Sequence, residues 1–146
     1  PPPPALWMAD ILDGKKIHSV SAHPNDGYTF ATCDRTCTIS LFDVRQRSKS
    51  GLKSISTYQT SRVQSCVKFS PCGRFLTTIG FDDLIHVFSE FMPKGFDKAK
   101  HCGIPHDNQT GRWLTPFKIC FDPLEPSNIM VGSLHRTLQH FEKIDS

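Results

Sequence analysis

The chain has 146 residues, a formal net charge of +3 and 38% hydrophobic residues. This length is enough for one domain, and the small positive charge is compatible with a polyanionic partner without requiring one. The apolar runs are short, so we expect neither a signal peptide nor a membrane span.

The cysteines indicate a reducing compartment, the cytosol or the nucleus. No two of them form a C-x-x-C pair, and several lie in apolar runs where a reduced cysteine packs as a small core residue. We therefore expect no metal site and no cofactor. The six positions are Cys33, Cys37, Cys66, Cys72, Cys102 and Cys120.

The first residues, Pro1 to Pro4, predict an extended lead-in, because proline donates no backbone hydrogen bond to a sheet. The chain starts without methionine and stops soon after a strand-like segment. We expect a fragment of a longer protein.

Three segments of the remaining chain superpose when each is aligned on a proline. The spacing from that proline to a later phenylalanine is 18 residues for Pro24–Phe42, 17 for Pro71–Phe88 and 18 for Pro123–Phe141. The three prolines are 47 and 52 residues apart. Such constant spacing indicates an internal repeat.

Each repeat predicts three short strands: one before the proline, one of small residues, and one that alternates and ends at the phenylalanine. A fourth, more variable strand is expected near Ser54–Tyr58 and, before the first repeat, near Leu6–Met8. The other predicted strands are Ile17–Ala22, Tyr28–Cys33, Thr38–Phe42, Val63–Phe69, Phe75–Ile79, Leu84–Phe88, Phe117–Phe121, Ile129–Gly132 and Thr137–Phe141.

Four antiparallel strands in about 45–50 residues are typical of a β-propeller blade. We therefore predict an all-β chain with about three blades of a partial propeller. Residues 1–14 would be the lead-in and the last strand of a preceding blade, 15–60 a blade, 61–105 a blade with a long basic connection, and 106–146 an incomplete blade. The remaining blades of the parent chain would cover the open sheets.

The repeats resemble WD repeats. Phe42, Phe88 and Phe141 stand where that family usually has tryptophan, and "FDVR" at 42–45 is similar to its W-D-x-R ending. The aspartate of the tight turn is kept as Asp82, whereas Thr36 and His135 take its place in the other repeats. The resemblance implies a propeller that usually has seven blades.

A long connection separates the second and third repeats. It carries more basic than acidic residues and ends in "TGRWLTPFK" at 110–118. Long connections inside a compact fold are usually functional or disordered. Together with "IPHDNQ" before it and "IMVGS" after it, this segment resembles the damaged-DNA-binding propellers and the related WD-repeat-76-like or Cmr-like proteins.

The resemblance implies that Gly111, Arg112 and Trp113 form a tip that contacts DNA, intact or damaged, or chromatin. Indole can stack on an exposed base, and arginine favours a narrow minor groove. Phosphate contacts are predicted at Lys16, Lys100 and Lys118. In the alternative, Trp113 packs onto its own propeller and Lys16 is only solvated.

A second resemblance concerns Asp43 and Arg45. In substrate receptors of cullin-RING ubiquitin ligases, the arginine of this pattern contacts the ligase's adaptor protein, and a planar guanidinium suits such an interface. The alternative is an aspartate that organises its own turn. A plain protein–protein scaffold without nucleic-acid affinity is a third possibility.

No pattern in the chain indicates an enzyme. G-x-S-x-G, P-loop and H-E-x-x-H motifs do not occur. Cys102 beside His101 and His106 is the nearest approach to a catalytic set, and it has no third orienting group. The sequence thus predicts a non-catalytic DNA-binding protein of the DNA damage response, located in the nucleus, with the cytoplasm as an alternative location.

Overall fold

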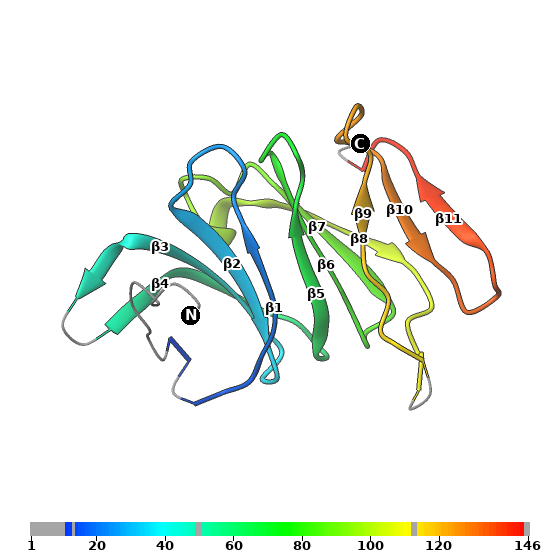
Figure 1. Cartoon of the computed structure of the whole chain (residues 1–146), viewed down its shortest axis with the longest axis horizontal. Helices are drawn as coiled ribbons and strands as arrows, with labels where there is room; N and C mark the ends of the chain where they lie inside the picture. Colours follow the sequence, from blue (N-terminus) through cyan, green and yellow to red (C-terminus); the bar gives the residue numbers. More distant parts are fainter. Residues whose placement is uncertain (1–10, 13, 49–50, 112–113, 145–146) are drawn as a thin grey trace, which may run out of the picture.

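Short β-branched and aromatic runs pair into three antiparallel sheets that stand side by side (Figure 1). The structure is a computed structural model and describes residues 11–12, 14–48, 51–111 and 114–144. The first sheet has the order β1-β2-β3-β4, the second β5-β6-β7-β8 and the third β11-β10-β9. The predicted all-β fold of partial propeller blades is confirmed. The strands are β1 (Ile17–Ala22), β2 (Thr29–Asp34), β3 (Thr38–Ser48), β4 (Gly51–Gln59), β5 (Gln64–Phe69), β6 (Phe75–Gly80), β7 (Leu84–Ser89), β8 (Lys100–Pro105), β9 (Cys120–Phe121), β10 (Ile129–Gly132) and β11 (Leu138–Phe141).

The strands that differ most in length from the prediction are β3, β4 and β9. β3 continues past Phe42 through an irregular register and pairs Arg47 with Leu52 of β4. β9 has only two paired residues, Cys120 and Phe121, because Phe117 lies outside the ladder and packs its ring against Gly132 of β10. The expected strand near Leu6–Met8 lies outside the described residues.

The connection after β7 is not one long loop, as the sequence suggested. A short 3-10 turn, η1 (Phe96–Lys98), is followed by β8, which pairs along the whole length of β7. Phe96 is buried, and Tyr58 of β4 and Phe88 of β7 both pack against its ring. The first half of the connection therefore completes the second sheet.

The tight turn after the second strand repeats in all three sheets. Cys37, Asp83 and Arg136 occupy equivalent positions there with left-handed backbone angles, at φ values of 62°, 58° and 60°. In the first sheet the turn is organised by Asp34 and not by the residue at the predicted position, Thr36. The Asp34 carboxylate accepts hydrogen bonds from the Thr36 N–H and hydroxyl, both at 2.7 Å.

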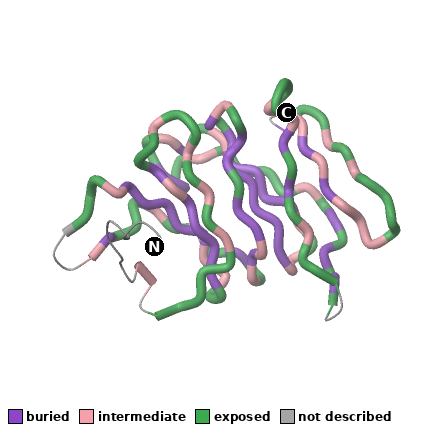
Figure 2. The backbone as a smooth tube through the Cα atoms, viewed as in Figure 1, coloured by how far each residue is buried: buried purple, intermediate pink, exposed green. Residues whose placement is uncertain are grey.

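Two hydrophobic clusters join the sheets. One contains Leu41 and Phe88 and links the first sheet to the second, and the other contains Phe75 and Val131 and links the second to the third. Figure 2 shows buried residues concentrated along the strands and exposed residues at the turns. Because both clusters use β5–β8, the middle sheet is packed on both sides.

The sheets place their turns on two opposite faces (Figure 1). The β2–β3, β6–β7 and β10–β11 turns, residues 60–63 and the described parts of the loop after β8, residues 106–111 and 114–119, lie on one face, at the bottom of the view, which we call the tip face. The β1–β2, β5–β6 and β9–β10 turns lie on the opposite face.

Candidate nucleic-acid interface

Asp83 fixes the base of the loop that leads to the predicted DNA-binding tip. Its carboxylate accepts hydrogen bonds from the Asn108 N–H at 3.0 Å and from the Gln109 side-chain amide at 2.9 and 3.0 Å. Its backbone carbonyl accepts the His106 N–H at 3.0 Å. One turn residue of the middle sheet therefore holds three residues of the loop.

Alternate side chains of the same loop point inward. His106, Asn108 and Thr110 are all buried. The His106 ring hydrogen-bonds to the Asn108 side chain and packs edge-on against Phe117 and Phe141. The loop is thus anchored between the second and third sheets.

Gly111 ends this anchored segment. It is exposed, has a φ of 64°, and a Cβ atom placed on it would meet no atom within 4 Å. A left-handed angle is freely available to glycine. Leu114, on the far side of the tip, has 53% of its surface exposed. The other two predicted tip residues, Arg112 and Trp113, lie outside the described residues.

The turn that presents Asp83 rests on a buried polar network. The Asp82 carboxylate lies 2.8 Å from the His86 ring and 2.8 Å from the Gln64 amide nitrogen. His86 in turn lies 2.9 Å from His101. Burial, and then the neighbouring His86, lower the pKa of His101. These contacts tie three strands of the sheet to the turn.

Exposed cations from all three sheets surround the tip face. Lys16 and Lys118, predicted from the sequence, are both exposed and precede β1 and β9. Three further arginines come from turns on this face. They were not predicted, because only the strand topology brings them together. They are Arg35, Arg62 and Arg136.

A polar hollow of about 440 Å³ lies beside the clamped loop. Arg62 lines one part of it, and Asp83 and Gln109 line another. Asp82 also lines the hollow, so two carboxylates offset the exposed guanidinium there.

The structure does not bring Lys100 to the tip face. Lys100 begins β8 and pairs with Ser89, whereas the loop to the tip begins after Pro105 at the other end of that strand. Five strand residues span roughly 16 Å. The Lys100 ammonium lies 2.6 Å from the Glu90 carboxylate, and both side chains are largely exposed. Lys100 was expected near the tip because a single loop over residues 92–115 would carry it there.

Asp43 and Arg45 form a preorganised pair. Arg45 donates from Nε at 3.0 Å and from a terminal nitrogen at 2.6 Å to the Asp43 carboxylate, and its guanidinium lies 4.6 Å from the centre of the Tyr28 ring. Hydrogen bonds from the Arg45 side chain, and then from its backbone, lower the pKa of Asp43. The Arg45 side chain is still 61% exposed.

Within the described ranges, no three His, Cys, Asp or Glu side chains gather as metal ligands would. The helical residues that the structure describes include no segment long and apolar enough to cross a membrane.

The three sheets with their repeated turns define a partial β-propeller built from WD repeats. Sequence comparison agrees. A WD repeat-containing protein 76 from Xenopus laevis is 32% identical over 139 residues, covering 88% of this chain and 22% of that protein. A DNA damage-binding protein CMR1 from Scheffersomyces stipitis is 33% identical over 161 residues, covering 94% and 30%. A CMR1 protein from Vanderwaltozyma polyspora is 30% identical over 123 residues, covering 75% and 23%.

The chain belongs to the WD-repeat family that includes WD repeat-containing protein 76 and CMR1. It spans less than a third of the length of these relatives. No family model matches the sequence.

Proposed function

We propose that the parent protein binds DNA, with a role in the DNA damage response, and that the tip at residues 111–113 makes the decisive contact. The observation that carries this proposal is the Asp83 clamp, which holds the loop to the tip on a face ringed by exposed cations. The CMR1 relatives are named DNA damage-binding proteins, which supports the proposal. A nuclear location on chromatin follows from this role.

Each part of the tip face has a physical task. Lys16, Lys118 and Arg62 neutralise phosphates, which gives affinity without reading sequence. Trp113 enters or stacks at a weakened base step, where unstacking costs least. Arg112 beside it suits the negative potential of a narrow minor groove. The binding is non-catalytic and needs no cofactor.

The test is a titration of the full-length protein with fluorescent duplexes, one intact and one with an abasic site. The Arg112→Ala/Trp113→Ala double variant should lose at least tenfold in affinity, about 1.4 kcal/mol, with its thermal unfolding unchanged. Unaltered affinity would contradict the proposed role of the tip. The ratio of intact to abasic affinity tells whether damage is preferred.

A second function is favoured by the Asp43–Arg45 pair. The guanidinium is fixed by three hydrogen bonds to Asp43, two from Nε and one from a terminal nitrogen, yet remains exposed. Beside it lies a cavity of about 250 Å³ that Met92 and Pro93 also line. A fixed, exposed arginine is suited to an adaptor protein of a cullin-RING ubiquitin ligase, because less rotamer entropy is lost on binding.

Arg45→Ala tests this second function, and Arg47→Ala is its matched control. Arg45→Ala should abolish co-purification of the adaptor with the full-length protein and leave DNA affinity unchanged. Retention of the adaptor by Arg45→Ala would contradict the role. If neither duplex binds while partners still co-purify, the protein is a plain protein–protein scaffold.

A further inference from the structure

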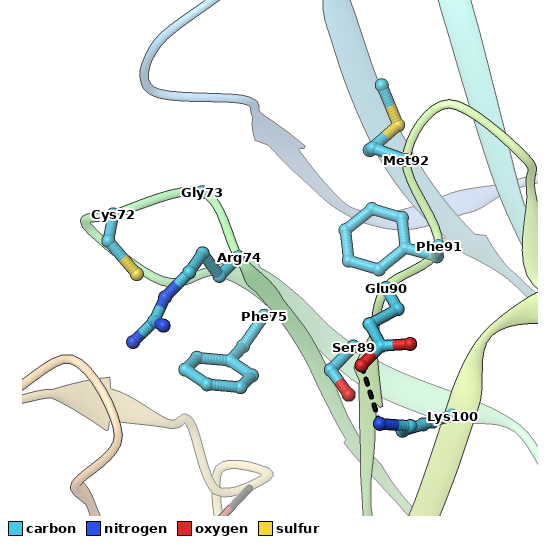
Figure 3. Close-up of a pocket in the computed structure, with 9 residues that line it drawn as sticks. All are labelled: Cys72, Gly73, Arg74, Phe75, Ser89, Glu90, Phe91, Met92 and Lys100. Carbon is cyan, nitrogen blue, oxygen red and sulfur yellow. Dashed lines mark hydrogen bonds and ion pairs between the residues drawn. The ribbon is translucent and has the colours of Figure 1, made fainter.

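The middle sheet carries a second cavity on the face opposite the tip. The cavity holds about 420 Å³, within the range of pockets that bind small ligands. Figure 3 shows the β5–β6 turn on one side of it and the segment after β7 on the other. We call it the Arg74 pocket, and the lining residues that matter here are Cys72, Arg74, Phe75, Phe91, Met92 and Lys100.

The pocket lies within the middle sheet. Its residues belong to the middle sheet and its connections, and this sheet is packed against the first sheet on one side and the third on the other.

The β5–β6 turn is held rigidly by the first sheet. The Gly73 carbonyl lies 3.2 Å from the His23 ring, and the Cys72 carbonyl accepts a hydrogen bond from the Asn25 amide at 2.8 Å. Gly73 has a φ of 74°, and a Cβ atom there would come within 2.7 Å of His23. This close packing fixes the wall that carries Arg74.

The apolar lining is equally fixed, with Phe75 beside Arg74 and with Phe91 and Met92 on the opposite wall (Figure 3). Phe91 is fully buried and packs against Phe69 and Phe96, while Phe75 is buried in the second cluster. Met92, half-buried beside Phe91, adds a flexible apolar surface. Aromatic side chains with a methionine form a floor that can accept an apolar side chain.

The rim of the pocket is positively charged. Lys100 is paired with Glu90 at 2.6 Å, which leaves Arg74 as the cation without a carboxylate partner among the described residues. Arg74 is exposed, and its guanidinium lies 5.3 Å from the centre of the Phe75 ring. A planar guanidinium binds carboxylates in bidentate fashion.

We propose that the Arg74 pocket binds an acidic linear peptide of a partner protein, with a carboxylate on Arg74 and a neighbouring apolar side chain over Phe75, Phe91 and Met92. The charge of the rim selects the acid, and the apolar floor selects a peptide over a nucleic acid. The pocket lies on the face away from the tip, so one molecule can hold DNA and this peptide together.

The test uses the full-length protein and the fluorescein-labelled peptide Gly-Ser-Glu-Phe-Glu-Ser-Gly, followed by fluorescence polarisation. The labelled peptide should bind the protein with a Kd below about 1 mM. The peptide with Gln in place of both Glu, and the peptide with Gly in place of Phe, should each bind at least tenfold more weakly.

Variants of the protein test where the peptide binds. Arg74→Ala should lose at least tenfold in peptide affinity, and Arg74→Lys, which keeps the charge but loses the bidentate geometry, should lose less. Arg35→Ala, an exposed arginine on the tip face, is the matched control and should bind the peptide normally. Arg74→Ala should bind duplex DNA like the unaltered protein, so failure here is distinct from failure of the DNA proposal.

Four results would overturn the proposal. If the peptide with Gln in place of Glu bound as tightly as the original peptide, the contact would be purely apolar. If the peptide with Gly in place of Phe bound as tightly as the original and sulfate displaced it, the pocket would be a simple anion site. Displacement of the peptide by duplex DNA would assign the pocket to nucleic acid. Unchanged peptide affinity in both Arg74 variants, with unchanged thermal unfolding, would place the peptide elsewhere.

Discussion

Gln109 donates its side-chain amide to both carboxylate oxygens of Asp83, at 2.9 and 3.0 Å, and to the carbonyl of Phe81 at 3.0 Å. A loop residue is thereby tied to the turn of the preceding blade, two positions before the tip at Gly111. Binding that depends on a correctly placed tip should depend on this tie, because ordering a loose loop costs free energy at the moment of binding.

Asp83→Gly should therefore weaken DNA binding about fivefold, the equivalent of about 1 kcal/mol. Glycine keeps the left-handed backbone angle of Asp83, so the turn itself is retained. Loss of a negative charge alone would strengthen DNA binding. The sign of the change in DNA affinity therefore separates the loss of the clamp from the loss of charge. The measurement is fluorescence polarisation with a labelled duplex.

Asp107→Ala is the control for that variant. Asp107 is exposed in the same loop and its carboxylate accepts only the Gln109 N–H at 3.1 Å among the hydrogen bonds described for it. Its removal should leave DNA affinity equal or slightly higher. If Asp83→Gly behaves like Asp107→Ala, the clamp has no part in binding.

Arg62→Ala should lower DNA affinity and also reduce the slope of log affinity against log salt concentration by about 1, as expected for one lost phosphate contact. Lys100→Ala removes the same charge from the opposite end of the sheet and should change neither quantity. A slope that falls equally in both variants would mean that DNA does not bind on the tip face.

Asp82→Ala should destabilise the protein by about 3 kcal/mol, because it leaves the buried Gln64 amide and His86 ring without their shared acceptor. Asp97→Ala, an exposed aspartate in η1, should have little effect. Thermal unfolding of the full-length variants measures both. Equal unfolding temperatures would show that the network contributes no stability.

The cysteines should differ sharply in reactivity. Burial, and then the neighbouring Cys66, raise the pKa of Cys33 to about 12. Partial burial opposes ionisation of Cys72, but hydrogen bonds from Ser70 and Arg74 lower the pKa of Cys72 below its usual value. Since only the thiolate reacts, iodoacetamide at about pH 8 should label Cys72 well before Cys33. Mass spectrometry of the peptides measures the order, and labelling of Cys33 first would contradict this packing.

The spacing of proline and phenylalanine was enough to place nearly all the strands of the three sheets. It worked because the third strand of each repeat carries a phenylalanine at a fixed distance from a turn. Phe42 and Phe88 are almost fully buried, and Phe141 is partly buried. β8 was missed because "KHCGIP" has no apolar alternation and its residues are mostly exposed. Such a strand is held by its backbone pairing with β7, which the sequence does not display.

The site was predictable only in part. Lys16 and Lys118 were named from their position near the loop, whereas the place of Lys100 depended on the missed strand. Arg35, Arg62 and Asp83 could not be assigned, because turn residues far apart in sequence meet on one face only after the sheets have formed. The family resemblance indicated the tip itself, residues 111–113.

The most direct measurement replaces Trp113 of the full-length protein with photoactivatable benzoylphenylalanine and irradiates it with a duplex containing one abasic site. The account predicts a protein–DNA crosslink that maps within a few nucleotides of the abasic position, while the same residue at Lys53, exposed on β4, gives none. A probe at 113 that crosslinks only within the protein, although the duplex is bound, would contradict the account.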